Sequence, residues 1–359
     1  MKIKAMLTRR FVMLTALASL SAFSTNAYAD YNLRFSEIGP PRGARAEVMQ
    51  WWADEVTRRT DGEVKIEFFW NQALTKGKDT LRAVGTGLAD MGTIMGIYNP
   101  AEVPVWNYGS LPFVADDVWV TLRTWQELQH SMPELKSEMT GHNVHILKNY
   151  TTGPSDIISK APIRTAEDMQ GKKIRASGSF LSLLNNIGAV PVNIGFGEVY
   201  QAMDRGTVDG AVVYTYAIKA YKFHEVGDYV TEVNMGLVPT MGAGINLDLW
   251  NSMPENIRQV LTEVSEEFPD RLAEALIRDM TDARDELEGG VDGRKLQFFT
   301  LNPEEREKWK QAANDFIVDW KKRATEKGLD PEKIIEQVNA VEAKYEKELA
   351  EKGYPWTRN

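Results

Sequence analysis

Three side chains near the ends of predicted strands, Arg175, Phe196 and Tyr214, have the types and spacing that suit recognition of a small acid. Residues 171–214 alternate between strand and helix periodicity, which is typical of a parallel sheet. Carboxyl ends of parallel strands share one sheet edge with helix amino ends, so the three side chains should converge there. A guanidinium beside aromatic rings and backbone N–H groups can hold a carboxylate bidentately. The alternative is that Arg175 is a solvated charge at a strand end.

The elements that position these residues follow from the periodicity of the same segment. Short apolar runs bounded by glycine predict strands, and apolar residues at helical spacing between them predict helices. The segment is predicted to contain strands over 173–176, 191–194 and 208–214, and helices over 180–187 and 198–205.

The rest of the chain repeats this alternation, so the fold class is α/β. Predicted strands cover 31–37, 64–70, 143–149 and 296–301, with a further strand entered at Gly92, and predicted helices cover 44–60, 79–86, 119–130, 303–327 and 331–352. One helix over 257–287, interrupted only by Pro269, is longer than a typical globular helix. We expect this helix to brace two domains.

The length of the chain favours two domains over a single core. Glycine, proline and hydroxyl residues over 150–155 predict a crossing from the first domain to the second, and the glycine-rich residues 236–244 predict the return. We expect lobe I to comprise 30–153 and 240–281, and lobe II to comprise 154–239 and 282–359.

The first 29 residues are predicted to be a secretory signal peptide. Four basic residues precede an apolar run over 11–23, and Ala27-Tyr28-Ala29 is a small-x-small cleavage site, so cleavage is expected after Ala29. An Arg9-Arg10 pair leaves the twin-arginine route open beside the general secretory route. A retained anchor is the alternative, although the apolar run is short of the roughly 20 residues that span a bilayer.

Charge and composition limit the possible partners. The formal net charge of −9 becomes −13 when the four basic residues of the signal peptide are removed. Such acidity disfavours binding of nucleic acid or of anionic membranes, and it requires an anion site to depend on local donors. The chain has no cysteine, which excludes thiol catalysis and thiolate metal sites.

Motifs for catalysis, nucleotides or metals are missing from the sequence. It contains no G-x-S-x-G, H-E-x-x-H, P-loop or EF-hand pattern. His142 and His145 are three residues apart, but they lie in a turn-and-strand context without a neighbouring carboxylate, which argues against a metal pair. We therefore expect no cofactor, no metal and no enzymatic activity.

Four ordered motifs in residues 171–214 resemble the substrate-binding proteins of TRAP transporters, of the C4-dicarboxylate-binding (DctP) type. They read GKKIRASG, GAVPV, GEVYQAMDRG and GTVDG. The resemblance extends to Ser159-Lys160-Ala161-Pro162-Ile163 and to the EVGDYVT segment at 225–231. It implies a two-lobed periplasmic binding protein fold that closes over a ligand.

By this resemblance Arg175 matches the arginine that grips the ligand carboxylate, and Phe196 matches a ring-stacking position. Val213 and Tyr214 match positions that contact the ligand, although many family members have Asn at the position of Val213. Many members also carry a second arginine where Pro154 and Ser155 stand here. That difference disfavours a dicarboxylate with two arginine partners.

Four further residues lie just past predicted strand ends and are expected to face the cleft. They are Trp70, Thr93, Met95 and Ser155. Aromatic residues among the candidates favour a partly apolar ligand, so an aromatic or hydroxy acid, a dicarboxylate and a sulfonate all remain open. The resemblance implies a periplasmic protein that delivers the anion to the membrane subunits of a TRAP permease. The alternatives are a sensor that docks on a membrane histidine kinase and a periplasmic enzyme.

Overall fold

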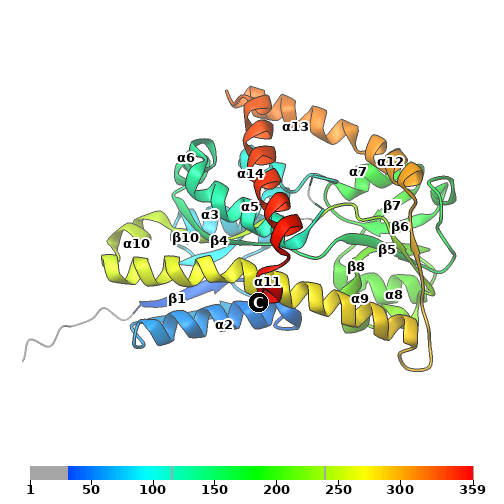
Figure 1. Cartoon of the computed structure of the whole chain (residues 1–359), viewed down its shortest axis with the longest axis horizontal. Coiled ribbons are helices and arrows are strands. Elements are labelled where there is room, and N and C mark those ends of the chain that lie inside the picture. Colours follow the sequence, from blue (N-terminus) through cyan, green and yellow to red (C-terminus); the bar gives the residue numbers. More distant parts are fainter. Residues whose placement is uncertain (1–30, 115, 238–239, 359) are drawn as a thin grey trace, which may run out of the picture.

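The computed structural model describes residues 31–114, 116–237 and 240–358, and Figure 1 shows the whole chain. The predicted signal peptide and its cleavage site lie outside the described residues. Two separate sheets form the frame of the protein, which confirms the two-lobed α/β fold.

The first lobe is built on a five-stranded sheet in the order β2-β1-β3-β10-β4. Its strands are β1 (Tyr31–Ser36), β2 (Val64–Phe69), β3 (Met91–Met95), β4 (Val144–Tyr150) and β10 (Met241–Asn246). Strand β1 runs parallel to β2 and β3, whereas β10 runs antiparallel to β3 and β4. The sheet is therefore mixed, and the antiparallel strand is the one that returns from the second lobe.

The second lobe is built on a six-stranded sheet in the order β11-β9-β5-β8-β6-β7. Its strands are β5 (Ser155–Ser159), β6 (Lys173–Ala176), β7 (Val190–Asn193), β8 (Gly210–Tyr214), β9 (Tyr229–Glu232) and β11 (Gln297–Thr300). Strands β8, β6 and β7 are parallel, as their periodicity predicted, and β5 is antiparallel to β8 and β9. The antiparallel strand β5 is again the one that directly follows a crossing between the lobes, at residues 151–154.

Helices cover the two sheets separately. Those of the first lobe are α2 (Gly43–Arg59), α3 (Thr80–Gly85), α4 (Pro104–Tyr108), α5 (Val118–Ser131), α6 (Pro133–Gly141) and α10 (Leu247–Ser252). Those of the second lobe are α7 (Phe180–Asn186), α8 (Val199–Asp204), α9 (Thr215–Ala220) and α12 (Pro303–Ala312). Helix α9 was not predicted from the sequence.

The predicted long helix is confirmed as α11 (Glu255–Gly289), 35 residues in length. Figure 1 shows it running along both lobes. In the first lobe the indole of Trp52 donates to Ser265 Oγ at 3.1 Å. In the second lobe Leu287 belongs to the apolar core beneath α8, and Arg284 pairs with Glu232 of β9. The helix is thus anchored in both lobes.

The C-terminal helices differ from expectation. The single helix predicted over 303–327 is two helices, α12 and α13 (Asn314–Glu326), separated at Ala313. Trp309 of α12 packs in the second lobe, whereas Trp320 of α13 is buried in the first. Helix α14 (Pro331–Lys352), expected in the second lobe, packs on α5, where Tyr345 donates to Glu127 at 2.8 Å.

In the described residues, the lobes are joined by residues 151–154, by helix α11 and by the α12–α13 pair. Within residues 31–114, 116–237 and 240–358, no helix has both the length and the apolar character needed to cross a bilayer.

Candidate functional site

A cavity of about 1300 Å³ lies where the two lobes and α11 meet. The first lobe contributes the segment that joins β1 to α2, and the second lobe contributes the loops after β6 and β7 together with α9. The side of α11 that carries Asp279 and Asp282 completes the wall. A molecule held there would contact both lobes.

Arg175 of β6 lines this cavity and is only 6% exposed. Its Nε donates to the carbonyl oxygen of Ile194 at 2.9 Å, which fixes the plane of the guanidinium. Within the described residues Arg175 has no carboxylate within ion-pair distance, and burial lowers its pKa from the ordinary value. A buried cation without a counterion is suited to accept an anionic ligand.

Aromatic rings extend along the wall from Arg175. Its guanidinium carbon lies 5.2 Å from the ring centre of Phe196, which stacks on Tyr214 at 6.0 Å. Tyr214 in turn stacks on Tyr216 at 5.8 Å and 9° between ring planes. These three rings line the cavity and form a continuous aromatic wall in the second lobe. The wall offers the body of a ligand an apolar face.

An ion pair lies in the part of the cavity that the first lobe forms. Glu37 follows β1 and is fully buried, and Arg45 of α2 donates to its Oε1 at 2.7 Å. The backbone N–H of Gly39 donates to the same oxygen at 2.9 Å. A Cβ atom on Gly39 would lie 2.1 Å from Arg45 Nη2, so the guanidinium packs directly on the glycine backbone.

Four of the eight residues predicted at the site line the cavity: Arg175, Phe196, Tyr214 and Met95. Two others lie one layer behind the wall. Thr93 donates to Glu37 Oε2, and Trp70 lies beside Arg45, whose guanidinium carbon is 5.8 Å from its ring. Both therefore support the ion pair and do not face the cavity themselves.

The structure does not bring Val213 and Ser155 into the cavity lining. Successive side chains of a strand point to opposite faces, so Val212 and Tyr214 face the cavity and Val213 packs in the core beneath α8. Ser155 opposes Tyr214 in the register of β5 and β8 and is fully buried. The expectation for Val213 ignored this alternation.

Sequence reasoning missed Glu37, Arg45, Tyr98 and Tyr216, which all line the cavity. Glu37 is the last residue of the strand predicted over 31–37, so the signal that selected Arg175, a charged residue at a strand end, also applied to it. The position of Tyr216 in the cavity depends on helix α9, which follows β8 directly and has no N-capping side chain that would have predicted its start.

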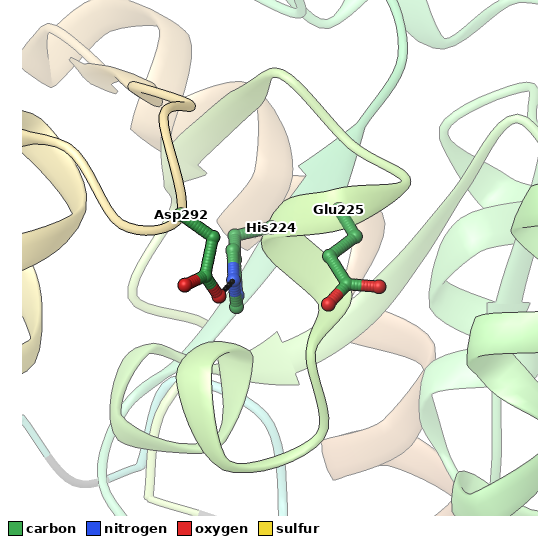
Figure 2. Close-up of side chains that lie close together, drawn as sticks. All are labelled: His224, Glu225 and Asp292. Carbon is green, nitrogen blue, oxygen red and sulfur yellow. Dashed lines mark hydrogen bonds and ion pairs between the residues drawn. The ribbon is translucent and has the colours of Figure 1, made fainter.

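His224, Glu225 and Asp292 form the group of potential metal ligands found in the described residues, with their ligand atoms within 4.8 Å of one another. Figure 2 shows the His224 ring directed at Asp292, with Glu225 on the other side. His224 Nε2 lies 3.5 Å from Asp292, and Tyr200 donates to Glu225 at 2.6 Å. None of the three lines the cavity. These contacts join residues 223–225 to the turn before β11.

The model of the family "Bacterial extracellular solute-binding protein, family 7", called DctP, matches residues 35–323. The chain is 26% identical to the C4-dicarboxylate-binding periplasmic protein DctP of Rhodobacter capsulatus, over 85% of this chain and 92% of that protein. It is 27% identical to the 2,3-diketo-L-gulonate-binding periplasmic protein YiaO of Escherichia coli, over 70% and 76%.

Solved structures show the same architecture. A TRAP periplasmic solute-binding protein of Desulfovibrio salexigens superimposes with a TM-score of 0.77 at 27% identity, covering 89% of this chain and 97% of that one. DctP7 of Bordetella pertussis, an extracytoplasmic solute receptor binding pyroglutamic acid, superimposes with a TM-score of 0.74 at 18% identity, covering 87% and 99%. The latter likeness concerns the fold.

Proposed function

This chain belongs to the DctP family of bacterial extracellular solute-binding proteins, and we propose that it captures a small organic acid anion and delivers it to a TRAP permease. Its family and its structural neighbours are solute-binding receptors for transport, so the protein is a receptor of this class and not an enzyme. The hypothesis of a periplasmic enzyme is therefore wrong.

The observation that carries the proposal is the buried guanidinium of Arg175, which has no ion-pair partner among the described residues, in a cavity shared by two lobes. A carboxylate or sulfonate placed there would accept charge-assisted hydrogen bonds from it. Phe196 and Tyr214 would contact the body of the ligand, and Met95 would contact it from the first lobe. We assign Thr93 and Trp70 a supporting role behind Arg45 and Glu37.

Capture by closure requires only that the ligand binds the shut state better than the open one. A ligand held by Arg175 in the second lobe and by the Arg45–Glu37 pair in the first has this property, since separating the lobes breaks one of the two sets of contacts. The connection between β4 and β5, residues 151–154, is the proposed hinge.

Proteins of the DctP family are periplasmic. For this chain we propose export by the N-terminal segment with cleavage after Ala29, which N-terminal sequencing of the secreted protein tests directly.

Delivery to a TRAP permease is tested with liposomes that contain the membrane subunits of the permease. Uptake of a radiolabelled acid should require addition of this protein, and uptake that is independent of it would contradict delivery.

The ligand class is tested by a thermal-shift screen. Carboxylates and sulfonates should raise the unfolding midpoint of the wild type, because a ligand that binds only the folded state stabilises it. Uncharged analogues of the same acids should leave the midpoint unchanged. Stabilisation by neutral analogues alone would contradict an acid receptor.

A further inference from the structure

The ion pair of the first lobe presents hydrogen-bond donors to the cavity without a net charge. Glu37 Oε1 accepts from Arg45 Nη1 and from the backbone N–H of Gly39. Glu37 Oε2 accepts from the Thr93 hydroxyl, and the Tyr150 hydroxyl lies 3.4 Å away. Both carboxylate oxygens are thus bonded within the protein, and Glu37 compensates the charge of Arg45.

Arg45 keeps donor capacity beyond this pair. A guanidinium has five N–H donors, and its other hydrogen bond within the described residues goes from Nη2 to Pro40 O at a long 3.4 Å. The Arg45 side chain is 14% exposed and lines the cavity. It can therefore donate to a ligand group that lies there.

Arg45 and Arg175 line the cavity from different lobes, Arg45 on α2 and Arg175 on β6. Burial acts to lower the pKa of Arg45, but the nearby Glu37, Tyr150, Tyr216 and Tyr221 raise it above its ordinary value. Tyr216 and Tyr221 belong to the second lobe, so Arg45 faces that lobe across the cavity. The stack of Phe196, Tyr214 and Tyr216 begins at Arg175 and lines the same cavity as Arg45.

The charges around the cavity disfavour a second anionic group on the ligand. Its lining carries five carboxylates, Glu37, Glu198, Asp279, Asp282 and Glu286, against four cations, Arg42, Arg45, Arg175 and Lys219. Lys219 pairs with Glu286, as Arg45 pairs with Glu37. Arg175 can form an ion pair with one anionic group of the ligand. A second anionic group near Arg45 would be repelled by the carboxylate of Glu37.

We propose that the Arg45–Glu37 pair is a specificity element that selects monoacids carrying an uncharged hydrogen-bonding group, such as a hydroxyl or oxo oxygen, at the end remote from the acid. This inference rests on the proposed function, because Arg175 must hold the acid group. Glu37 excludes dicarboxylates by like-charge repulsion, and Arg45 donates to the uncharged oxygen.

The test compares ligand pairs that differ only in the remote group. Suitable pairs are 4-(hydroxymethyl)benzoate with terephthalate, and 5-hydroxypentanoate with glutarate. Calorimetry on the wild type should give dissociation constants at least tenfold lower for the hydroxy acid of each pair that binds. Glu37→Gln frees the charge of Arg45 and should shift that ratio at least tenfold towards the dicarboxylate. Glu47→Gln, which removes the same charge from the exposed face of α2, should leave the ratio unchanged.

The binding results separate the selectivity for monoacids, the role of Glu37 and the proposed function. Equal or tighter binding of dicarboxylates by the wild type overturns the selectivity while leaving the acid receptor intact, and this holds even if Glu37→Gln does not fold. An unchanged ratio in folded Glu37→Gln overturns the role of Glu37. A wild type that binds no member of either pair, and no acid in the thermal-shift screen, contradicts the proposed function itself.

Discussion

Arg175 donates from Nε to the carbonyl oxygen of Ile194 at 2.9 Å, a contact that ties the guanidinium to the chain just after β7. The other N–H groups of the guanidinium form no hydrogen bond to the described residues. The strand pair β6–β7 thus holds a cation in place before any ligand arrives. Such preorganisation lowers the cost of ordering on binding.

Arg175 should reduce the stability of the ligand-free protein. A buried charge without a counterion costs free energy, and burial lowers the pKa of this guanidinium accordingly. Arg175→Met should therefore raise the free energy of unfolding by about 1 kcal/mol, measured by urea titration without ligand. A destabilised variant would show that Arg175 has a structural partner and is not held ready for a ligand.

The Phe196 ring should contribute to affinity through the cation it faces. The guanidinium carbon of Arg175 is 5.2 Å from the ring centre, within the range of a cation–π contact. Phe196→Leu should weaken acid binding about two- to fivefold, from a loss of roughly 0.5–1 kcal/mol. Phe196→Tyr keeps the ring and serves as the control. Equal affinities for the two variants, measured by calorimetry, would contradict the ring's role.

Asp156 should make the free energy of unfolding decrease as the pH rises from about 4 to about 7. Burial raises its pKa to about 7, against the lowering effect of hydrogen bonds from Asn234 N at 3.1 Å and Thr215 Oγ1 at 3.3 Å. An unfolded Asp titrates near pH 4. In this window the folded state holds a proton that the unfolded state has released. Its stabilising contribution is complete below about pH 4 and lost as the pH rises to about 7.

Asp156→Asn removes that titration and leaves those of Glu138 and Glu342, whose pKa values burial also raises to about 7. Urea unfolding at pH 4.5, 6 and 7.5 should show a flatter profile for the variant, by roughly 2–4 kcal/mol across the range. Parallel profiles for wild type and variant would show that Asp156 is ionised in the folded protein.

Lys148 should destabilise the first lobe. It is fully buried on β4, with Nζ 3.1 Å from Met49 Sδ and 3.6 Å from the ring centre of Phe268. Burial lowers the pKa of Lys148 well below its ordinary value. Lys148→Met should raise the midpoint of thermal unfolding by several degrees, whereas the exposed Lys65→Met should not change it. A lower midpoint for Lys148→Met would indicate that the aromatic rings stabilise a charged ammonium.

Periodicity was sufficient to predict the elements that span the core. Helix α11 extends only two residues beyond the predicted 257–287 at each end, because its apolar face is continuous between Pro254 and Gly290. The helix predicted over 303–327 is divided at Ala313, since its two halves pack on different lobes. Such a division depends on tertiary packing that periodicity does not encode.

The cavity was predictable only where strand ends point to it. Arg175 could be found because it belongs to a strand of a parallel sheet and carries a charge. Arg45 lies in the first turn of α2, and only its contact with Glu37 distinguishes it from an exposed helix residue. That contact depends on the path of the segment between β1 and α2, which periodicity does not predict.

The central claim is that Arg175 binds the acid group of the ligand, and calorimetry on Arg175→Met tests it most directly. The titrant is the acid that stabilises the wild type most in the thermal-shift screen, and the control is Arg205→Met, which removes an exposed arginine from the same lobe. Arg175→Met should lose about 2 kcal/mol or more of binding free energy while Arg205→Met binds like the wild type. Unchanged affinity in a folded Arg175→Met would contradict the account.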